Sequence, residues 1–156
     1  MKKVIVLIFI LAFSMPLISC STDNKEPLQP EQQTLTGYLF LEGNTLKVDE
    51  FEFITSKDKE RMQELGLTEA DMPNGYEIYN ESEELKSFTL DENTQYHFYD
   101  TSNLFVKEED DKKYSTTDLN QFQLFLYRGD DTPSRTPFEM VIEGDKVISI
   151  TEIFVN

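Results

Sequence analysis

The sequence predicts an α+β fold, either a mostly antiparallel β-sheet or a small half-open barrel, of about seven strands with two helices. Short runs rich in Val, Ile, Phe and Tyr recur along the chain with turn residues between them, as in antiparallel sheets. Two other stretches combine N-cap residues, apolar side chains at helical spacing and a closing glycine. Residues 37–156 hold all of these elements without a second linker or a repeat, so we expect a single β-rich globular domain.

The domain begins with a predicted β-hairpin, formed by residues 38–41 and 46–54 around a turn at Gly43. The alternation of apolar residues shifts by one position along the second strand. Leu46 and Val48 are at even positions, whereas Phe51 and Phe53 are at odd positions. One extra residue at Asp49 or Glu50 would form a bulge there. We expect such a bulge, because it would keep the four apolar side chains on one buried face.

A short, mostly solvated helix is expected next. Thr55 and Ser56 offer an N-cap, and Asp58 complements the positive end of the helix dipole. Gly66 is placed to end the helix. After a turn signal in residues 72–75, three extended segments are predicted: 76–79, 86–90 and 95–99.

The second half of the chain contains a predicted loop and the best helix. Residues 106–114 carry too many charges to pack, so we expect a loop there. Residues 115–118 then provide the cap of a helix that Gly129 stops. The helix has one apolar face, formed by Leu119, Phe122, Phe125 and Leu126.

The chain closes with a predicted hairpin of residues 138–142 and 146–155 around a turn at Gly144. Its second strand has apolar residues on both parities, so we expect it to lie centrally in the sheet and to be covered on both faces. An OB-like barrel is the specific architecture to test first, although the predicted order of elements departs from the usual order of that fold.

The first nineteen residues have the layout of a secretory signal: a positive start, an apolar run over residues 4–13 and a short segment before a cleavage site. A membrane-spanning helix needs about 20 apolar residues. Here the apolar stretch is interrupted by Ser14 and Pro16. We therefore expect residues 1–19 to be a cleaved signal peptide and not a permanent anchor helix.

The signal ends in Leu17, Ile18, Ser19 and Cys20, which resemble the lipobox of bacterial lipoproteins. The resemblance covers only the signal region and indicates a small envelope lipoprotein. It implies that diacylglycerol is transferred to the Cys20 thiol and that cleavage leaves Cys20 as the new N-terminus. A deprotonated thiol suits this reaction as a strong nucleophile, and two or more acyl chains hold a protein durably in a bilayer. The alternative is an ordinary secretory signal with a cysteine at that position by chance.

We expect lipid at Cys20 to anchor the protein at the cell membrane, on its extracytoplasmic face. Cys20 is the only cysteine of the chain, so no intramolecular disulfide can form. The residues that follow are polar and include two prolines, and we interpret residues 20–36 as the lipidated cysteine and a flexible tether.

The charge of the chain limits its partners. The full sequence has a formal net charge of −16, and removal of residues 1–19 takes away Lys2, Lys3 and no acid, which gives −18. Such a field disfavours nucleic acid and anionic headgroups, whereas cationic partners, divalent ions and neutral ligands remain possible. A simpler interpretation is that the acidity only keeps an exported domain in solution.

No familiar catalytic or cofactor motif occurs in the sequence. It contains no Gly-x-Ser-x-Gly elbow, Gly-rich phosphate loop or His-Glu-x-x-His pair, so we assign no catalytic, cofactor-binding or metal-ligating residue and expect no cofactor. His97 is the only histidine. It has no second histidine or cysteine near it to make a zinc site, and we expect an ordinary strand residue.

Three weaker signals remain open. A pair of carboxylates such as Glu50 with Glu77 could hydrolyse a cell-wall polymer, although thirty acids always offer some pair. Residues 108–111 and 130–131 could bind Ca²⁺, but they lack the spaced pattern of calcium loops and favour a solvated loop. An exposed aromatic group could stack on a sugar or a peptide, for which the candidates are Tyr76, Tyr79 and Tyr99.

The first hypothesis is therefore a surface-anchored lipoprotein whose non-enzymatic domain binds a protein, a peptide or a cation. The alternatives are a hydrolase with paired carboxylates and a divalent-cation-binding protein. An enzyme would have a deep cleft in which two acids with perturbed pKa values converge. A binding module would instead have a shallow aromatic patch or a bare sheet edge.

Overall fold

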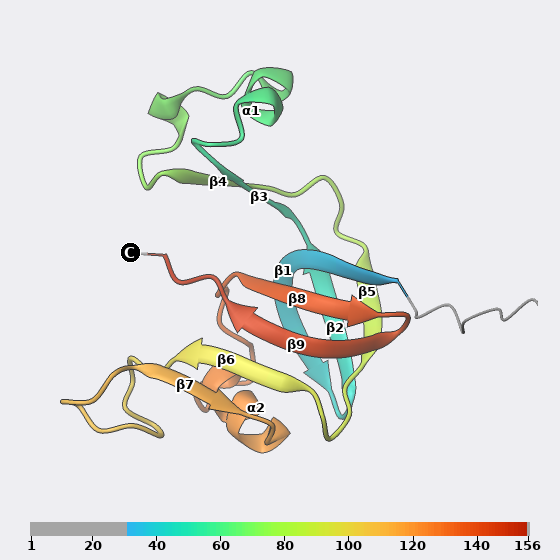
Figure 1. The fold of residues 1–156 in the computed structure, drawn as a ribbon, viewed down its shortest axis with the longest axis vertical. Helices are drawn as coiled ribbons and strands as arrows, with labels where there is room; N and C mark the ends of the chain where they lie inside the picture. Colours follow the sequence, from blue (N-terminus) through green and yellow to red (C-terminus); the bar gives the residue numbers. More distant parts are fainter. Residues whose placement is uncertain (1–30, 156) are drawn as a thin grey trace, which may run out of the picture.

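The computed structural model describes residues 31–155, so the predicted signal peptide, Cys20 and most of the predicted tether lie outside the described residues. The fold is α+β, as predicted (Figure 1). Its elements are β1 (Gln32–Glu42), β2 (Thr45–Glu50), β3 (Glu52–Thr55), α1 (Lys59–Leu65), the 3-10 helix η1 (Glu69–Asp71), β4 (Tyr76–Tyr79), β5 (Leu85–Thr89), β6 (Gln95–Tyr99), β7 (Lys113–Thr116), α2 (Leu119–Tyr127), β8 (Phe138–Glu143) and β9 (Lys146–Glu152).

Seven of the strands form one mostly antiparallel sheet in the order β5-β2-β1-β8-β9-β6-β7. A further parallel contact between β5 and β9, at Thr89 and Lys146, brings the first five strands of this order into a ring. The backbone N–H of Thr89 also donates to the Asp145 carbonyl oxygen, at 2.8 Å. The sheet is therefore a barrel-like ring that β6 and β7 extend on one side.

The ring also explains the unusual order of elements in the sequence. One insertion, from β3 to β4, separates β2 from β5, and a second, β6 with β7, separates β5 from α2. Without these insertions the order is three strands, one helix and two strands. This is the arrangement of the predicted OB-like barrel, interrupted twice.

The main hydrophobic core fills the ring and continues under α2. Leu39, Val48, Met140 and Ile150 from the strands are fully or almost fully buried, and α2 adds its predicted apolar face. The aromatic part of this core is dense, since the rings of Phe98 and Phe125 stack at 4.0 Å between centroids. Burial of apolar area on this scale is the main force that holds such a domain together.

β1 is shared between two partners. It pairs with β8 from Gln32 to Gly37 and with β2 from Gly37 to Glu42. Gly37 lies where the two pairings meet, and a Cβ atom at this position would stand 2.6 Å from Cγ1 of Val48 and 2.8 Å from the Asp49 carbonyl oxygen. Only glycine allows β1 and β2 to approach this closely.

The predicted tether is too long, because β1 already begins at Gln32. The residues from Gln32 to Thr36 pair with β8 through their backbones. The side chains of Gln32, Gln33 and Thr34 are exposed, so this first part of β1 carries no apolar alternation that could identify it as a strand. The ordered domain therefore starts before the predicted boundary at residue 37.

The predicted bulge at Asp49 or Glu50 is absent. The register of β2 with β1 is regular up to Glu50, after which the chain leaves the ring and enters a separate two-stranded sheet of β3 and β4. Phe51 sits at this crossing, is 4% exposed and packs on Tyr38 with 4.8 Å between the ring centroids. The phase change in the sequence therefore marks a change of sheet.

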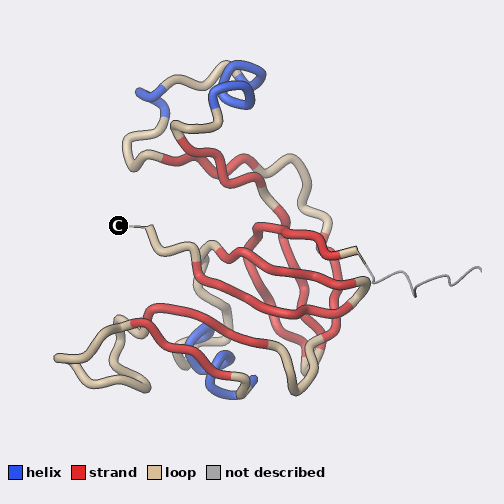
Figure 2. Tube along the Cα trace, viewed as in Figure 1, coloured by secondary structure: helices blue, strands red, loops and turns tan. Residues whose placement is uncertain are grey.

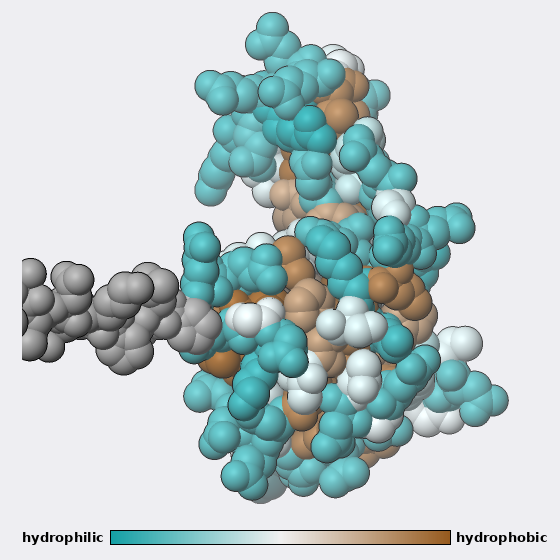
Figure 3. All heavy atoms as spheres, turned by 90° about the vertical axis from the view of Figure 1, so that its right-hand side faces the viewer, coloured by the Kyte–Doolittle hydropathy of each residue, from teal (hydrophilic) through white to brown (hydrophobic). Residues whose placement is uncertain are grey.

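The segment from β3 to β4 forms an arm, defined here as residues 52–79, that projects from the ring (Figures 1 and 2). The arm has a small core of its own, formed by Ile54, Met62 and Met72, against which Leu65, Leu67 and Tyr79 pack. The molecule narrows between the arm and the ring, and most of the face in Figure 3 is hydrophilic, with apolar residues visible in small patches.

The helix boundaries follow the predicted signals with local shifts. The N-cap of α1 is Asp58, whose carboxylate accepts from the backbone N–H and the hydroxyl of Thr55, both at 2.8 Å. Gly66 ends α1 as predicted, in the left-handed conformation. Asp118 caps α2, while Arg128, and not Gly129, is its left-handed C-cap.

Two further expectations need correction. The last part of the predicted loop and the start of the predicted helix cap form an edge strand, β7, paired with β6. β9 is central, between β8 and β6, but it ends at Glu152 and is not covered on both faces, since Ile148 is 38% exposed. Ile150, which has the same parity as Ile148, is nevertheless fully buried.

Candidate functional site

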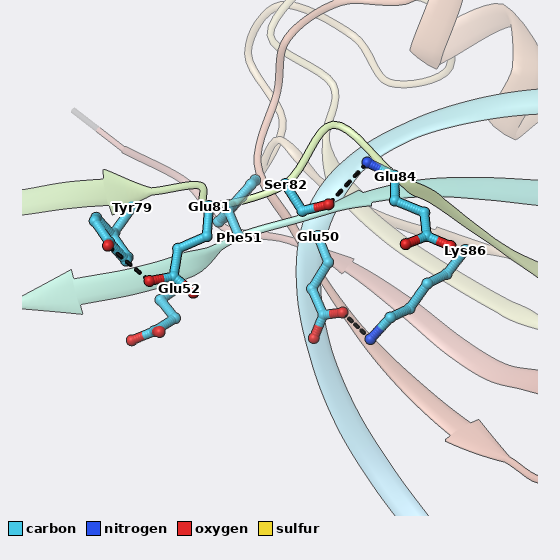
Figure 4. A pocket seen from close by; sticks show the side chains of 8 residues that line it. All are labelled: Glu50, Phe51, Glu52, Tyr79, Glu81, Ser82, Glu84 and Lys86. Atoms are coloured by element: carbon cyan, nitrogen blue, oxygen red, sulfur yellow. Dashed lines mark hydrogen bonds and ion pairs between the residues drawn. The ribbon is translucent and has the colours of Figure 1, made fainter.

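A hollow of about 400 Å³ lies where the arm joins the ring (Figure 4). We call it the acidic hollow, because four of its eight lining residues are glutamates and only one is a base. The lining residues are Glu50, Phe51, Glu52, Tyr79, Glu81, Ser82, Glu84 and Lys86. They come from the end of β2, the two strands of the arm, the linker of residues 80–84 and the start of β5.

The linker of residues 80–84 is held in place by a chain of short polar contacts. Nδ2 of Asn80 donates to Oδ1 of Asp49 at 2.8 Å, which fastens the linker to β2. The backbone N–H of Ser82 donates to Oδ1 of Asn80 at 3.0 Å, and that of Glu84 donates to Oγ of Ser82 at 3.1 Å. These local bonds are typical of Asn and Ser in turns. They orient Glu81 and Glu84 at the rim of the hollow.

The glutamates of the hollow differ in their partners. Glu50 forms an ion pair with Lys86 (Figure 4). Glu52 accepts two hydrogen bonds from the Arg61 guanidinium, each 2.7 Å long, and these bonds hold the pKa of Glu52 below its usual range. Neither Glu81 nor Glu84 forms an ion pair with any residue in the described part of the chain. The hollow therefore keeps an excess of negative charge.

Hydrogen bonds shift the pKa values of two groups in the hollow, Glu52 and Tyr79. The Tyr79 hydroxyl donates to Oε1 of Glu81 at 2.7 Å, and this bond raises the pKa of Tyr79. A general acid needs a carboxyl group whose pKa is raised, and the pKa of Glu52 is lowered. Burial raises the pKa of Glu152, but this residue does not line the hollow.

The carboxylate pair considered for hydrolysis is not brought together in this site. Glu50 lines the acidic hollow, whereas Glu77 lies on β4 opposite Ile54 and is not among the lining residues. Glu50 is also engaged by Lys86. The hollow thus gives no support to the specific pair Glu50 and Glu77.

A second hollow of about 580 Å³ lies along β1, and we call it the β1 groove. It is lined by residues 38–42 of β1, by Asp49, by Tyr127 of α2 and by residues 131–135. The Arg135 guanidinium lies 4.8 Å from the centre of the Tyr38 ring, a cation–π contact. The groove adjoins the acidic hollow, since Tyr38 packs on Phe51 and Asp49 accepts from Asn80.

His97 lies on β6, as predicted, with Tyr96 and Phe98 buried on the opposite face. Its Nδ1 atom is 2.8 Å from Oγ of Ser115 on the paired strand β7. No carboxylate partner of His97 is present within the described residues. His97 therefore occupies an ordinary strand position.

The three tyrosines considered as a stacking patch do not lie together. Tyr76 and Tyr79 are on β4 in the arm, while Tyr99 is on β6 in the large sheet. Tyr76 stacks on Phe53 at 4.8 Å, and Tyr99 packs on Phe154 at 4.4 Å. The expectation of one exposed aromatic group formed by these residues is wrong.

The acidic loops are not assembled into a metal site. Within residues 31–155, no three His, Cys, Asp or Glu side chains are grouped so that they could hold a metal ion. The loop that contains residues 108–111 is closed by Lys112, whose Nζ donates to the Lys107 carbonyl oxygen at 2.7 Å.

No helix within residues 31–155 is long and apolar enough to cross a membrane.

Sequence reasoning missed Glu81 and Glu84 as site residues. The available signal was the acidic run of residues 81–84 between two predicted strands. It also missed Arg135, since nothing in the sequence places residues 131–135 beside β1.

A comparison of the chain with protein-family models, with curated proteins and with solved structures found no match.

Proposed function

We propose that this protein is a lipid-anchored envelope lipoprotein whose extracytoplasmic domain binds a positively charged segment of a partner protein or peptide in the acidic hollow. One observation carries the proposal. The hollow gathers four glutamates around one lysine, and two of these glutamates, Glu81 and Glu84, have no cationic partner in the described structure. A basic side chain would supply the missing charge.

The anchor in this proposal rests on the resemblance of Leu17 to Cys20 to a lipobox. The start of β1 at Gln32 leaves residues 21–31 between the lipidated cysteine and the folded domain. A chain of this length reaches at most about 40 Å. The acidic hollow would therefore stay close to the membrane, where it meets other envelope proteins.

The electrostatics suit a reversible interaction. The carboxylates lie at or near the surface, where one ion pair contributes about 0–1 kcal/mol and is weakened by salt. Complementary charge then mainly increases the association rate and selects the partner by sign. We expect binding to weaken as the ionic strength rises.

The test uses fluorescence anisotropy with a labelled peptide of alternating lysine and glycine. The mature chain carries Cys20→Ser so that no lipid is attached. The variant Glu81→Gln/Glu84→Gln removes two charges from the hollow. The matched control Glu108→Gln/Glu109→Gln removes the same charge from the exposed β6–β7 loop.

We expect the hollow variant to weaken binding about fivefold at physiological salt, because two contacts of about 0.5 kcal/mol each are lost. The control should change the affinity by less than about twofold. Equal weakening by both variants would mean that only the overall negative field attracts the peptide, and the assignment to the hollow would be wrong.

The anchor has a separate test. Mass spectrometry of the native protein should find Cys20 as the first residue, with diacylglycerol on its sulfur. Cys20→Ser should leave the leader uncut or release the protein from the membrane fraction. A native product with an unmodified Cys20 thiol would contradict the anchor and leave the peptide-binding test unaffected.

A further inference from the structure

One side of β5 has no partner strand over most of its length. β5 pairs with β2 from Leu85 to Thr89, and on its other side it meets β9 only at Thr89. Within the described residues, no strand accompanies that other side from Leu85 to Phe88, which we call the β5 edge. Figure 1 shows β5 at the right-hand side of the ring, where the chain returns from the arm.

The bonds at the end of β5 show which residues face the β5 edge. The Leu90 N–H donates to the Asn44 carbonyl oxygen at 2.9 Å, next to β2, whereas the Thr89 N–H donates at 2.8 Å to Asp145, on the opposite side. The direction of the backbone groups alternates along a strand. Leu85 and Ser87 therefore direct their N–H and C=O groups to the β5 edge, as Thr89 does.

These backbone groups are accessible. Leu85 is 46% exposed, Lys86 and Ser87 are also exposed, and β5 contains no proline. The other edge strand of the large sheet, β7, differs in this respect. The N–H of Lys113 in β7 already donates to Oδ1 of Asp111 at 3.0 Å. The β5 edge is thus the more open of the two places where another strand could pair.

The β5 edge begins at the rim of the acidic hollow. Glu84, which directly precedes Leu85, and Lys86, the second residue of β5, both line the hollow (Figure 4). Lys86 is engaged by Glu50, whereas Glu84 forms no ion pair in the described part of the chain. Side chains alternate between the two faces of a strand. A strand added here would therefore bring every second side chain to the face of Glu84.

The remaining side chains of an added strand would lie beside Leu85 and Ser87, because directly opposite residues of paired strands point to the same face. An apolar side chain at this place would cover the exposed side chain of Leu85. Charge on one face and burial on the other therefore favour a segment in which basic and apolar residues alternate.

We propose that the basic partner segment is extended and adds to β5 as an antiparallel strand, with its backbone paired to Leu85 and Ser87. Main-chain hydrogen bonds would supply affinity, and the alternating side chains would supply selectivity. This inference rests on the proposed function of the acidic hollow, because the hollow supplies the requirement for positive charge. It adds the conformation of the partner and the strand that receives it.

The test separates backbone pairing from charge. The probe is a labelled hexapeptide of alternating lysine and valine, added to the mature Cys20→Ser chain. Two isomers of the peptide are compared, one N-methylated at its lysines and the other at its valines, so that charge and composition are identical. In an antiparallel pair, the residues opposite Leu85 and Ser87 direct their own N–H groups to β5. With lysines on the face of Glu84, these residues are the valines.

We expect methylation of the valines to weaken binding about tenfold and methylation of the lysines to weaken it less than about threefold, because only the first removes two backbone hydrogen bonds. Equal binding of the two isomers would overturn strand addition. The reverse preference would overturn the antiparallel arrangement. Failure of the acidic hollow is recognised separately, by an unchanged affinity of Glu81→Gln/Glu84→Gln for the peptide of lysine and glycine.

Amide exchange followed by NMR gives a second measurement. The N–H of Ser87 should become protected when the unmethylated peptide is added, whereas the N–H of Ser115, an exposed residue of β7, should not change. An unchanged Ser87 in the presence of bound peptide would overturn the proposal. A Ser87 that is already protected without peptide would also overturn it, because the chain itself or a second copy would then occupy the β5 edge.

Discussion

Gly37 shows how one small side chain determines the shape of the ring. The β1 strand exchanges its partner there, and the space above its Cα is already filled by Val48 and the Asp49 carbonyl group. Any larger residue must push β1 and β2 apart. The acidic hollow and the β1 groove both border on this part of β2, so the spacing at Gly37 also affects the candidate sites.

We predict that Gly37→Ala lowers the free energy of unfolding by about 1–3 kcal/mol, the usual cost of an overpacked core position. The measurement is urea unfolding followed by circular dichroism. Ser87→Ala, on an exposed position of β5, is the control and should change stability by less than about 0.5 kcal/mol. A Gly37→Ala protein as stable as the control would show that β1 and β2 can separate without loss.

Asp100 is a buried charge with a structural task. Its carboxylate is 0% exposed and accepts three backbone N–H groups, from Leu104 at 2.8 Å, Phe105 at 2.6 Å and Val106 at 2.9 Å. Burial alone raises the pKa of Asp100, but the three hydrogen bonds outweigh it, and the pKa lies below its usual range. The carboxylate thus fixes the start of the β6–β7 loop.

We predict that Asp100→Asn costs about 1–3 kcal/mol of stability at neutral pH, because a charged acceptor of three donors is lost. The lowered pKa in the folded state means that the carboxylate stabilises the protein above the pKa of the unfolded chain. This contribution disappears as the pH falls through the lower, folded-state pKa. Unfolding measured from neutral pH into the acid range should therefore show the gap between wild type and variant closing below about pH 4. A gap that stays constant would contradict the charged role of Asp100.

Some elements could be located in the sequence because turn residues isolate them. β4 and β6 have the predicted limits, Tyr76–Tyr79 and Gln95–Tyr99, since Gly and Asn signals precede them and aromatic residues fill them. The buried face of α2 was predicted from the spacing of Phe122 and Phe125 with their apolar neighbours. In these segments the local pattern and the tertiary packing agree.

Other elements depend on pairing that leaves no mark in the sequence. The first residues of β1 are polar and are held by backbone bonds to β8, more than one hundred positions away in the chain. Val48 and Phe53 differ in parity because they belong to different sheets, which alternation alone cannot distinguish from a bulge.

The candidate sites were harder to predict than the fold for the same reason. The acidic hollow needs β2, the arm and the residues 80–84 to meet, and the acidic run of residues 81–84 does not reveal what faces it. The β1 groove exists because β8 begins only at Phe138. The end of a partner strand is a tertiary property, so the β1 groove could not be found from the residues that line it.

The arm should behave as a unit of low stability, because its core of Ile54, Met62 and Met72 is separate from the main core. We predict that Met72→Ala destabilises the arm by about 2–3 kcal/mol, as expected for a methionine truncated in a core. Hydrogen exchange of amides in α1 and β4 should accelerate, whereas the slowest amides of β1 and β8 should change little. Equal acceleration in the ring would show that the arm and the ring unfold together.

At the scale of the whole molecule, the excess of acids over bases destabilises the compact state, and a positively charged partner would reduce this repulsion. The mature chain would carry a charge of −18, because its signal contains two lysines and no acid. The ion pairs of the described residues are at the surface, for example Lys59 with Glu69 and Lys86 with Glu50, and they engage only some of the acids. The remaining carboxylates repel one another in the compact state.

We therefore predict that stability in urea increases when sodium chloride is raised from about 0.02 M to about 0.5 M, because screening weakens this repulsion more than it weakens the few exposed ion pairs. The variant Glu108→Lys/Glu109→Lys is four charges less negative and changes only exposed positions of the β6–β7 loop. It should be more stable than wild type at low salt and should gain less from added salt. A loss of stability on adding salt would contradict this prediction, because it would show that the ion pairs stabilise the protein more than the repulsion between carboxylates destabilises it.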